Sequence, residues 1–345
     1  MASTAAPTHP SRIEDLLMST VAAIPQTTSV RLQETRLLAG IGFGLLAAAS
    51  WAGYTVSSRV GVTAGYTAAD LTFLRFFVAG IVLLPFVLRR GFRGLAGIGW
   101  RRGVVLALGA GPLFSGLYTF GLGVTPYAHG PVISPSIVTI GALALAALFL
   151  GERPNALRLL GIGAVILGLV LVAGGEAFFG GPSSFSRYDL MFVASGLLWA
   201  GYTVLLRRWN LDPVAATAAV AVVSMIAVTP FYLATADVGR LFVDPTTLAF
   251  HALTQGLVAA VIAVIAFSKA VAILGAGRAG IFPSLVPVIA VLLGIPVLGE
   301  WPTAAQTVGV AVASTGLLLA SGIVAQRQGT GAIIARRKFA RTTAA

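Results

Sequence analysis

The hexapeptide Trp51-Ala52-Gly53-Tyr54-Thr55-Val56 occurs a second time, letter for letter, as Trp199-Ala200-Gly201-Tyr202-Thr203-Val204, at an offset of 148 residues (51 to 199). The same offset relates further pairs along the chain: Arg59 with Arg207, Pro135 with Pro283, Gly151-Glu152-Arg153-Pro154 with Gly299-Glu300-Trp301-Pro302, and Gly161, Gly168 and Gly174 with Gly309, Gly316 and Gly322. Because the chain contains only five tryptophans and the matches follow without a gap, they indicate duplication rather than chance. The pattern predicts two repeats, residues 37–175 and 187–324.

Lipid is the predicted solvent of the chain. Of its 345 residues, 57% are hydrophobic and 10% are charged, and the mean hydropathy is +0.93, whereas soluble domains average about 45–50% apolar and 25% charged residues. Ten apolar windows are long enough to cross a bilayer: near 39–58, 70–88, 103–123, 129–150, 157–174, 190–206, 213–235, 249–272, 279–298 and 304–324. Their continuity favours helices over barrel strands. The predicted fold class is an all-α polytopic membrane protein of ten transmembrane helices.

The distribution of basic residues predicts the orientation in the membrane, because positively charged loops stay cytoplasmic. With the N-terminus inside, 18 of the 23 Lys and Arg fall in inner loops, against Arg59, Arg187 and Arg240 outside. Both termini are then cytoplasmic, as a flexible tail at 1–36 and a basic tail at 325–345. Each repeat holds five spans, an odd number, so the second repeat enters from the opposite side. Such inverted repeats predict alternating access, with a solute pocket between the halves.

Two five-helix units, each with a Trp in its first helix and a Gly-Glu-x-Pro turn after its fourth, resemble the EamA family of the drug/metabolite transporter superfamily. The resemblance covers about residues 39–324. Pro287, thirteen residues before Glu300, and Arg75 in the second span are similar to recurrent features of the family. The resemblance implies export of amino acids and other metabolites. Thr139 stands where the second repeat has Pro287, which makes the halves unequal there.

Aromatic side chains are the first candidates for substrate binding. Trp51 and Tyr54 share one face of the first helix, as Trp199 and Tyr202 do in the second repeat, because residues three apart are neighbours on a helix. We include Tyr118, in the third span, with them. These rings could stack on an apolar side chain or hold a cation. The alternative is that they serve helix packing or the interfacial belt.

Charged and titratable residues within the spans are the second group of candidates. Arg75 and Lys269 lie inside spans, where a charge generally faces a cavity or a partner, and a substrate carboxylate or phosphate would suit them. The alternative is that they snorkel to the membrane surface. His129, at the outer start of the fourth span, is a candidate for gating or proton coupling. No acidic residue lies deeper than a helix end, so coupling through a buried acid is not expected.

Turn and kink residues complete the set. Glu152 and Glu300 precede Pro154 and Pro302, and we expect their carboxylates to accept hydrogen bonds from the first amides of the next helix. Pro135, Pro283 and Pro287 interrupt helical runs and are candidate kinks that let a half-bundle bend.

The preferred function is therefore a secondary transporter that exports amino acids or related amphipathic metabolites. A nucleotide-sugar or phosphate-ester exchanger and a non-transport scaffold are the alternatives. No catalytic motif and no ATP-binding motif is present, and the three histidines are scattered, so we expect neither an enzyme nor a metal or cofactor. The expected partners are a small-molecule substrate and the lipid bilayer, without nucleic acid, for a monomer or homodimer. Arg outnumbers Lys by 21 to 2, which suits a bacterium and its inner membrane.

Overall fold

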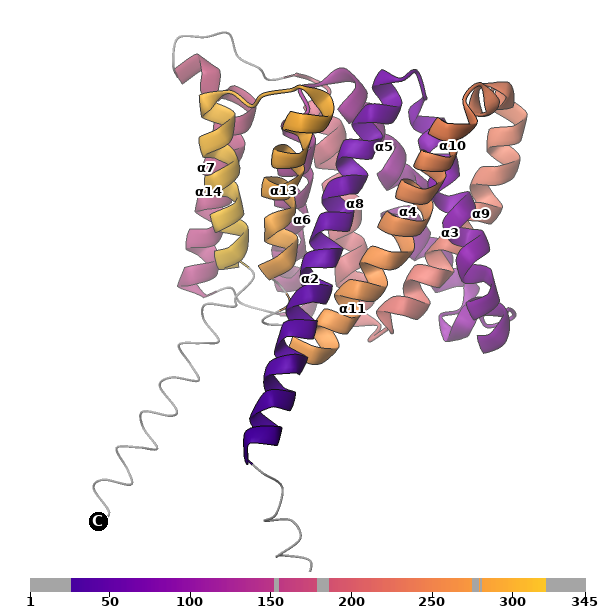
Figure 1. The fold of residues 1–345 in the computed structure, drawn as a ribbon, viewed down its shortest axis with the longest axis horizontal. Coiled ribbons are helices and arrows are strands. Elements are labelled where there is room, and N and C mark those ends of the chain that lie inside the picture. The colour runs from indigo at the N-terminus through magenta and orange to yellow at the C-terminus, as the bar shows by residue number, and fades with distance from the viewer. Residues whose placement is uncertain (1–25, 152–154, 179–185, 275–278, 280, 321–345) are drawn as a thin grey trace, which may run out of the picture.

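A computed structural model describes residues 26–151, 155–178, 186–274, 279 and 281–320. The first repeat consists of α2 (Gln26–Thr63), α3 (Ala68–Arg90), η1 (Leu95–Gly97), α4 (Trp100–Ala110), α5 (Pro112–Val124), α6 (His129–Leu150) and α7 (Ala156–Phe178). The second consists of α8 (Asp189–Arg208), α9 (Pro213–Thr235), η2 (Val238–Phe242), α10 (Pro245–His251), η3 (Ala252–Ile262), α11 (Ala263–Leu274), α13 (Ile281–Leu298) and α14 (Ala304–Ala320). The helices stand side by side in one bundle (Figure 1).

The all-helical prediction is confirmed for the described residues, which contain no strand. Seven helical segments are long and apolar enough to cross a membrane, and three shorter apolar helices accompany them, at Ala156–Val172, Phe282–Leu298 and Ala304–Ala320. The first helix starts at Gln26, within the segment expected to be a flexible tail. The tail at 325–345 lies outside the described residues.

The third segment of each repeat is interrupted, where the sequence predicts continuous spans at 103–123 and 249–272. Between α4 and α5 the backbone leaves the helical region at Gly111, with φ −95° and ψ −144°, directly before Pro112. Proline lacks an N–H and clashes with a preceding helical turn, which accounts for the break. In the second repeat the π-helix η3 separates α10 from α11. Turns of π-helix are rare in proteins, and those that occur often lie at functional sites.

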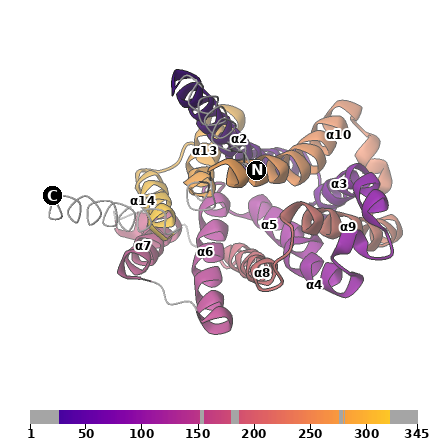
Figure 2. The same ribbon diagram turned by 90° about the horizontal axis from the view of Figure 1, so that it is seen from below.

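Each repeat packs its first helix against the third and fourth segments of the other repeat. Helix α2 contacts α11 and α13, and correspondingly α8 contacts α5 and α6 (Figure 2). Two further large contacts join equivalent helices, α3 with α9 and α7 with α14, and α3 also packs on η3. If each helix is replaced by its equivalent in the other repeat, the same set of helix contacts results. The two repeats are therefore related by an approximate twofold symmetry.

The first helices of the two repeats run in opposite directions. Near the end of α2, Arg59 donates hydrogen bonds to the carbonyls of Leu122 and Thr125, at the end of α5. Four residues after Thr125, His129 begins α6 and bonds to Asp189, the first residue of α8. The end of α2 therefore lies at the same end of the bundle as the start of α8 (Figure 1). We refer to this end as the Asp189 end and to the opposite one as the Arg90 end.

Basic residues are segregated between the two ends. Exposed arginines of the α3–α4 connection and of the end of α8 gather at the Arg90 end: Arg89, Arg90, Arg93, Arg101, Arg102, Arg207 and Arg208. Arg59, Arg187 and Arg240 lie at the Asp189 end.

Helices α7 and α14 pack through the glycines that the repeat relates to one another. A Cβ on Gly161 would lie 2.8 Å from the carbonyl oxygen of Gly316, and one on Gly309 would lie 2.9 Å from that of Gly168. Gly168 is equally crowded, since its Cβ would lie 2.6 Å from the backbone nitrogen of Ala313. Small residues allow such close helix contacts in membranes. The duplicated glycines therefore form one reciprocal interface.

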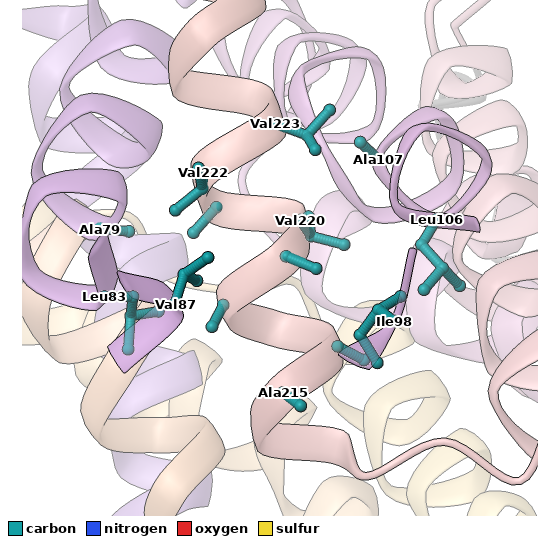
Figure 3. Packing of buried hydrophobic residues seen from close by; sticks show 14 of the residues in the cluster. Ala79, Leu83, Val87, Ile98, Leu106, Ala107, Ala215, Val220, Val222 and Val223 are labelled. Carbon is teal, nitrogen blue, oxygen red and sulfur yellow. The ribbon is translucent and has the colours of Figure 1, made fainter. Parts of the chain in front are cut away.

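The largest hydrophobic core surrounds α9. Small and β-branched residues of this helix, Ala215, Val220, Val222 and Val223, pack between α3 and α4 (Figure 3). The same cluster contains Ala79, Leu83 and Val87 of α3, Ile98 before α4, and Leu106 and Ala107 of α4. Ala79 lies one turn after Arg75 on α3 and is fully buried. The core thus holds α3, and with it Arg75, in a fixed position.

Candidate functional site

Arg75 is a buried cation without a hydrogen-bonding partner. It lies on α3 with 6% of its surface exposed, and its Nε and Nη1 atoms are buried and unpaired. The guanidinium carbon lies 4.3 Å from the centre of the Tyr54 ring on α2. None of the ion pairs found in the described part of the chain involves it. Buried charges are normally paired, so this guanidinium is available to an anionic ligand.

Hydroxyl groups lie on Arg75's own helix and around the Tyr54 ring, outside hydrogen-bond distance of Nε and Nη1. Tyr54 Oη lies 3.5 Å from Ser115 Oγ on α5, and Tyr118 Oη lies 3.1 Å from Thr55 Oγ1. Thr72 lies three residues before Arg75, on the same face of α3, and its buried hydroxyl has no partner. The site therefore combines one cation with several hydroxyl donors, a set that suits a carboxylate.

A row of aromatic rings extends from this site toward the second repeat. The ring of Tyr54 is 5.8 Å from Tyr118, which is 6.2 Å from Phe114 on α5. Phe114 is 4.7 Å from Trp199 on α8, and Trp199 is 5.3 Å from Tyr202. The row thus starts in one half of the bundle and ends in the other. Its faces suit an apolar or aromatic side chain.

Side chains fill the site, whereas the sequence predicts a hollow between the halves. Tyr54 and Tyr118 are only 7% and 5% exposed. A shallow recess of about 170 Å³ lies elsewhere, between α3, α9 and the η3–α11 segment, and Thr217 is its one polar lining residue. A solute therefore reaches Arg75 only if helices move apart.

The structure brings together five of the predicted substrate-binding residues, namely Tyr54, Arg75, Tyr118, Trp199 and Tyr202. It places the other three elsewhere. The Trp51 ring packs 5.5 Å from Phe267 on α11. Lys269 is exposed, with its Nζ 5.1 Å from the centre of the Phe43 ring. His129 lies at the Asp189 end of the bundle.

Among the described residues, three pairs of charged or titratable side chains join the repeats at the Asp189 end, one of them Arg240 Nη1 with Asp70 Oδ2 at 3.7 Å. His129 Nδ1 lies 2.8 Å from Asp189 Oδ1, and both side chains are buried. Arg59 Nε donates to Glu300 Oε1 at 2.8 Å, from α2 to the turn between α13 and α14. Glu300 was expected to accept hydrogen bonds from the first amides of the next helix. Thr303 and Gln306 cap that helix instead. Glu152 lies outside the described residues.

The predicted kink prolines take up different positions. Pro135 lies inside α6, where the Thr139 hydroxyl donates to its carbonyl at 3.0 Å. Pro287 lies inside α13. Pro283 lies in the described part of α13, near its first described residue.

The sequence analysis missed a second buried polar cluster, one turn from Tyr54 along α2. Ser57 contacts both His251 and Thr254, and Gln255 donates to Ser58 at 3.0 Å. The residues of this cluster are separated by nearly 200 positions in the chain, and no repeat relates them. A buried histidine within a predicted span was the one available signal.

Two tyrosines in the turns at the Asp189 end stay protonated at neutral pH. Burial raises the pKa of Tyr127, whose hydroxyl donates to the carbonyl of Ala290 on α13 at 3.0 Å. Burial also raises the pKa of Tyr66, and the carboxylates of Asp244 and Asp70 raise it further.

Comparisons with known proteins agree with this architecture. The model of the EamA-like transporter family matches residues 38–174 and again residues 186–322. An uncharacterized transporter of Archaeoglobus fulgidus is 27% identical over 275 residues, covering 78% of this chain and 92% of the relative. A protein of known crystal structure superposes with a TM-score of 0.55 at 20% identity, covering 86% of this chain and 99% of the other, which shows a shared fold.

Proposed function

The chain belongs to the EamA-like transporter family, in the drug/metabolite transporter superfamily, and from this premise we propose that it exports amino acids or related amphipathic metabolites. Family members are transporters, not enzymes. The unpaired, buried guanidinium of Arg75 beside the aromatic row carries the proposal. The cation and its hydroxyls would bind the substrate carboxylate, and the aromatic rings would contact the apolar side chain.

A carboxylate is favoured over a phosphate ester. Arg75 is the one cation at this site among the described residues, and Lys269, the other basic residue within a span, lies exposed and apart from it. The two negative charges of a phosphate ester would exceed the single positive charge. A scaffold without a ligand is disfavoured, because the desolvation of a buried, unpaired charge lowers stability.

The proposed mechanism is alternating access by two inverted repeats. It is supported by the opposite directions of α2 and α8 and by the exchanged packing of the two halves. Ion pairs bridge the repeats at the Asp189 end in this closed form, so opening that end requires them to separate. We place the arginine-rich Arg90 end in the cytoplasm of a bacterial inner membrane, with both termini on that side.

The substrate class is tested by transport into proteoliposomes. We expect labelled leucine and phenylalanine to be carried, while leucinol, which lacks the carboxylate, fails to compete. Carriage of leucinol as fast as leucine, or of none of the amino acids, would contradict the proposal.

The orientation is tested by cysteine labelling, since the natural chain has no cysteine. A cysteine at the exposed Arg93 should react only from the cytoplasm, and one at Val243, which is 82% exposed, only from outside. Reaction of both from one side would refute the inverted arrangement.

A further inference from the structure

Hydrogen-bond accounting fixes the tautomer of His251. The Thr254 hydroxyl donates its single proton to the carbonyl of Phe250 at 2.8 Å. Thr254 Oγ1 must therefore accept from Ser57, whose Oγ lies 2.6 Å away. Ser57 has then used its only proton, so at 3.2 Å it accepts from Nδ1 of His251. In neutral His251, Nδ1 thus carries the hydrogen and Nε2 carries a free lone pair.

This lone pair is a buried acceptor without a donor. The His251 side chain has no exposed surface, and its Nε2 has no hydrogen-bonding partner. Leaving a buried polar atom unpaired costs roughly 1–3 kcal/mol, so such an atom calls for an explanation. The Nε2 of His129 is also buried and unpaired, but the Nδ1 of that ring contacts the carboxylate of Asp189, whereas His251 has no carboxylate partner among the described residues.

No carboxylate pairs with the imidazole in the described structure. From α2 it faces Ser57 and Gly61, and from the turn before α3 it faces Tyr66, whose ring lies 5.2 Å away and whose hydroxyl is also unpaired. Asp70 accepts from Thr67 and Tyr232, and lies 3.7 Å from Arg240. Asp244 accepts from Thr246 and Thr247 at the start of α10. A proton on Nε2 would therefore create a cation that no acidic side chain compensates while the bundle is closed.

His251 also lies at a junction between an α-helix and a π-helix. It ends α10 and is followed directly by the π-helix η3. Its partner Ser57 follows Tyr54 by three residues on α2, about 4.5 Å along the helix axis. Opening of the substrate site would thus admit water to the Nε2 atom, whose lone pair then gains the donor it lacks in the closed form.

We propose that His251 makes closure of the transporter depend on pH: Nε2 takes up a proton from the water on the side to which the site is open, and returns it to that water before the bundle closes. The proton is bound by a lone pair already present and leaves to water, so no other reactant is needed. Because closure requires the neutral imidazole, a lower pH slows closure. This inference rests on the proposed transport function.

The first test measures exchange of labelled leucine by the full chain in proteoliposomes, with the same pH on both sides, from mildly alkaline to mildly acidic pH. Because one proton must leave before closure, the exchange rate should fall about tenfold per pH unit once the imidazole of the open form is mostly protonated. We expect His251→Gln to lose this fall while exchange itself persists, and Ser57→Ala to weaken it. Ser58→Ala, a change beside the network but outside the donor chain to His251, is the control and should retain it. An equal fall in the exchange rate of His251→Gln and of the natural chain would overturn the proposal.

The second test needs no substrate, so it decides about His251 even if leucine is not carried. Nitrogen-15 NMR of labelled histidine, assigned by the signal lost in His251→Gln, should show a bare Nε2 in the lipid-embedded protein near neutral pH. Ser57→Ala, which removes the acceptor, should release the imidazole from this single tautomer. An Nε2–H tautomer in the natural chain would contradict the hydrogen-bond assignment and, with it, the proton site.

Discussion

Replacing Arg75 by methionine should separate transport from stability. The loss of a charged hydrogen-bonding partner removes about 1.5–3 kcal/mol of substrate binding. At 1.4 kcal/mol per tenfold, kcat/KM for leucine should fall by roughly 10- to 150-fold. Lys269→Met removes an exposed cation that lies apart from the site, and it should leave transport unchanged.

The stability of the Arg75→Met variant, unlike its transport, should not decrease. The substitution breaks no hydrogen bond at Nε or Nη1, because neither atom has a partner. It removes the contact with the Tyr54 ring, worth about 0.5–2 kcal/mol, but also a buried charge whose desolvation costs several kcal/mol. The free energy of unfolding should therefore stay constant or rise, as measured by thermal melting in detergent. A variant that melts several degrees lower and still carries leucine at the natural rate would show that Arg75 is structural.

Three further changes test the packing and the site. Gly161→Ala should lower the melting temperature, because overpacking costs about 1–3 kcal/mol. The control, Gly163→Ala, lies on the same helix with free space around it and should leave the melting temperature unchanged. Equal losses in the two variants would refute the close contact of α7 with α14. A double-mutant cycle of Arg59→Gln and Glu300→Gln should give a coupling of about 0.2–1 kcal/mol that salt reduces, and zero coupling at low salt would contradict the ion pair. Trp199→Ala should raise KM more for phenylalanine than for alanine, since stacking contributes about 0.5–1.5 kcal/mol, and equal changes would exclude ring contact.

The sequence predicted those features that one chain segment determines. Apolar windows located the helices, and an exact hexapeptide repeat revealed the duplication. Arg75 was identified because a charge within an apolar span is costly wherever it lies. Residues spaced three apart on one helix were expected to act together, yet Trp51 and Tyr54 contact different neighbours. Two residues on the same face of one helix can therefore contact different neighbouring helices.

Features that depend on several segments were not predictable. The partner of Glu300 lies 241 residues earlier, and that of His251 Nδ1 lies 194 residues earlier. Local propensity favoured a helix cap for Glu300, but a guanidinium brought close by the fold competes successfully for its carboxylate. The π-helix has no composition signal of its own. It packs closely on α3, where a Cβ on Gly256 would lie 3.2 Å from the carbonyl oxygen of Leu74.

The glycine contacts between α7 and α14 have a consequence for motion. Exchanging the two halves turns the contact of Gly161 with Gly316 into that of Gly309 with Gly168, so the pair is its own image. In the proposed alternating-access cycle, an interface of this kind can stay packed whichever end of the bundle opens. Helices α7 and α14 would then remain in contact while the other helices move, and a bulky residue between them would weaken both proposed states equally.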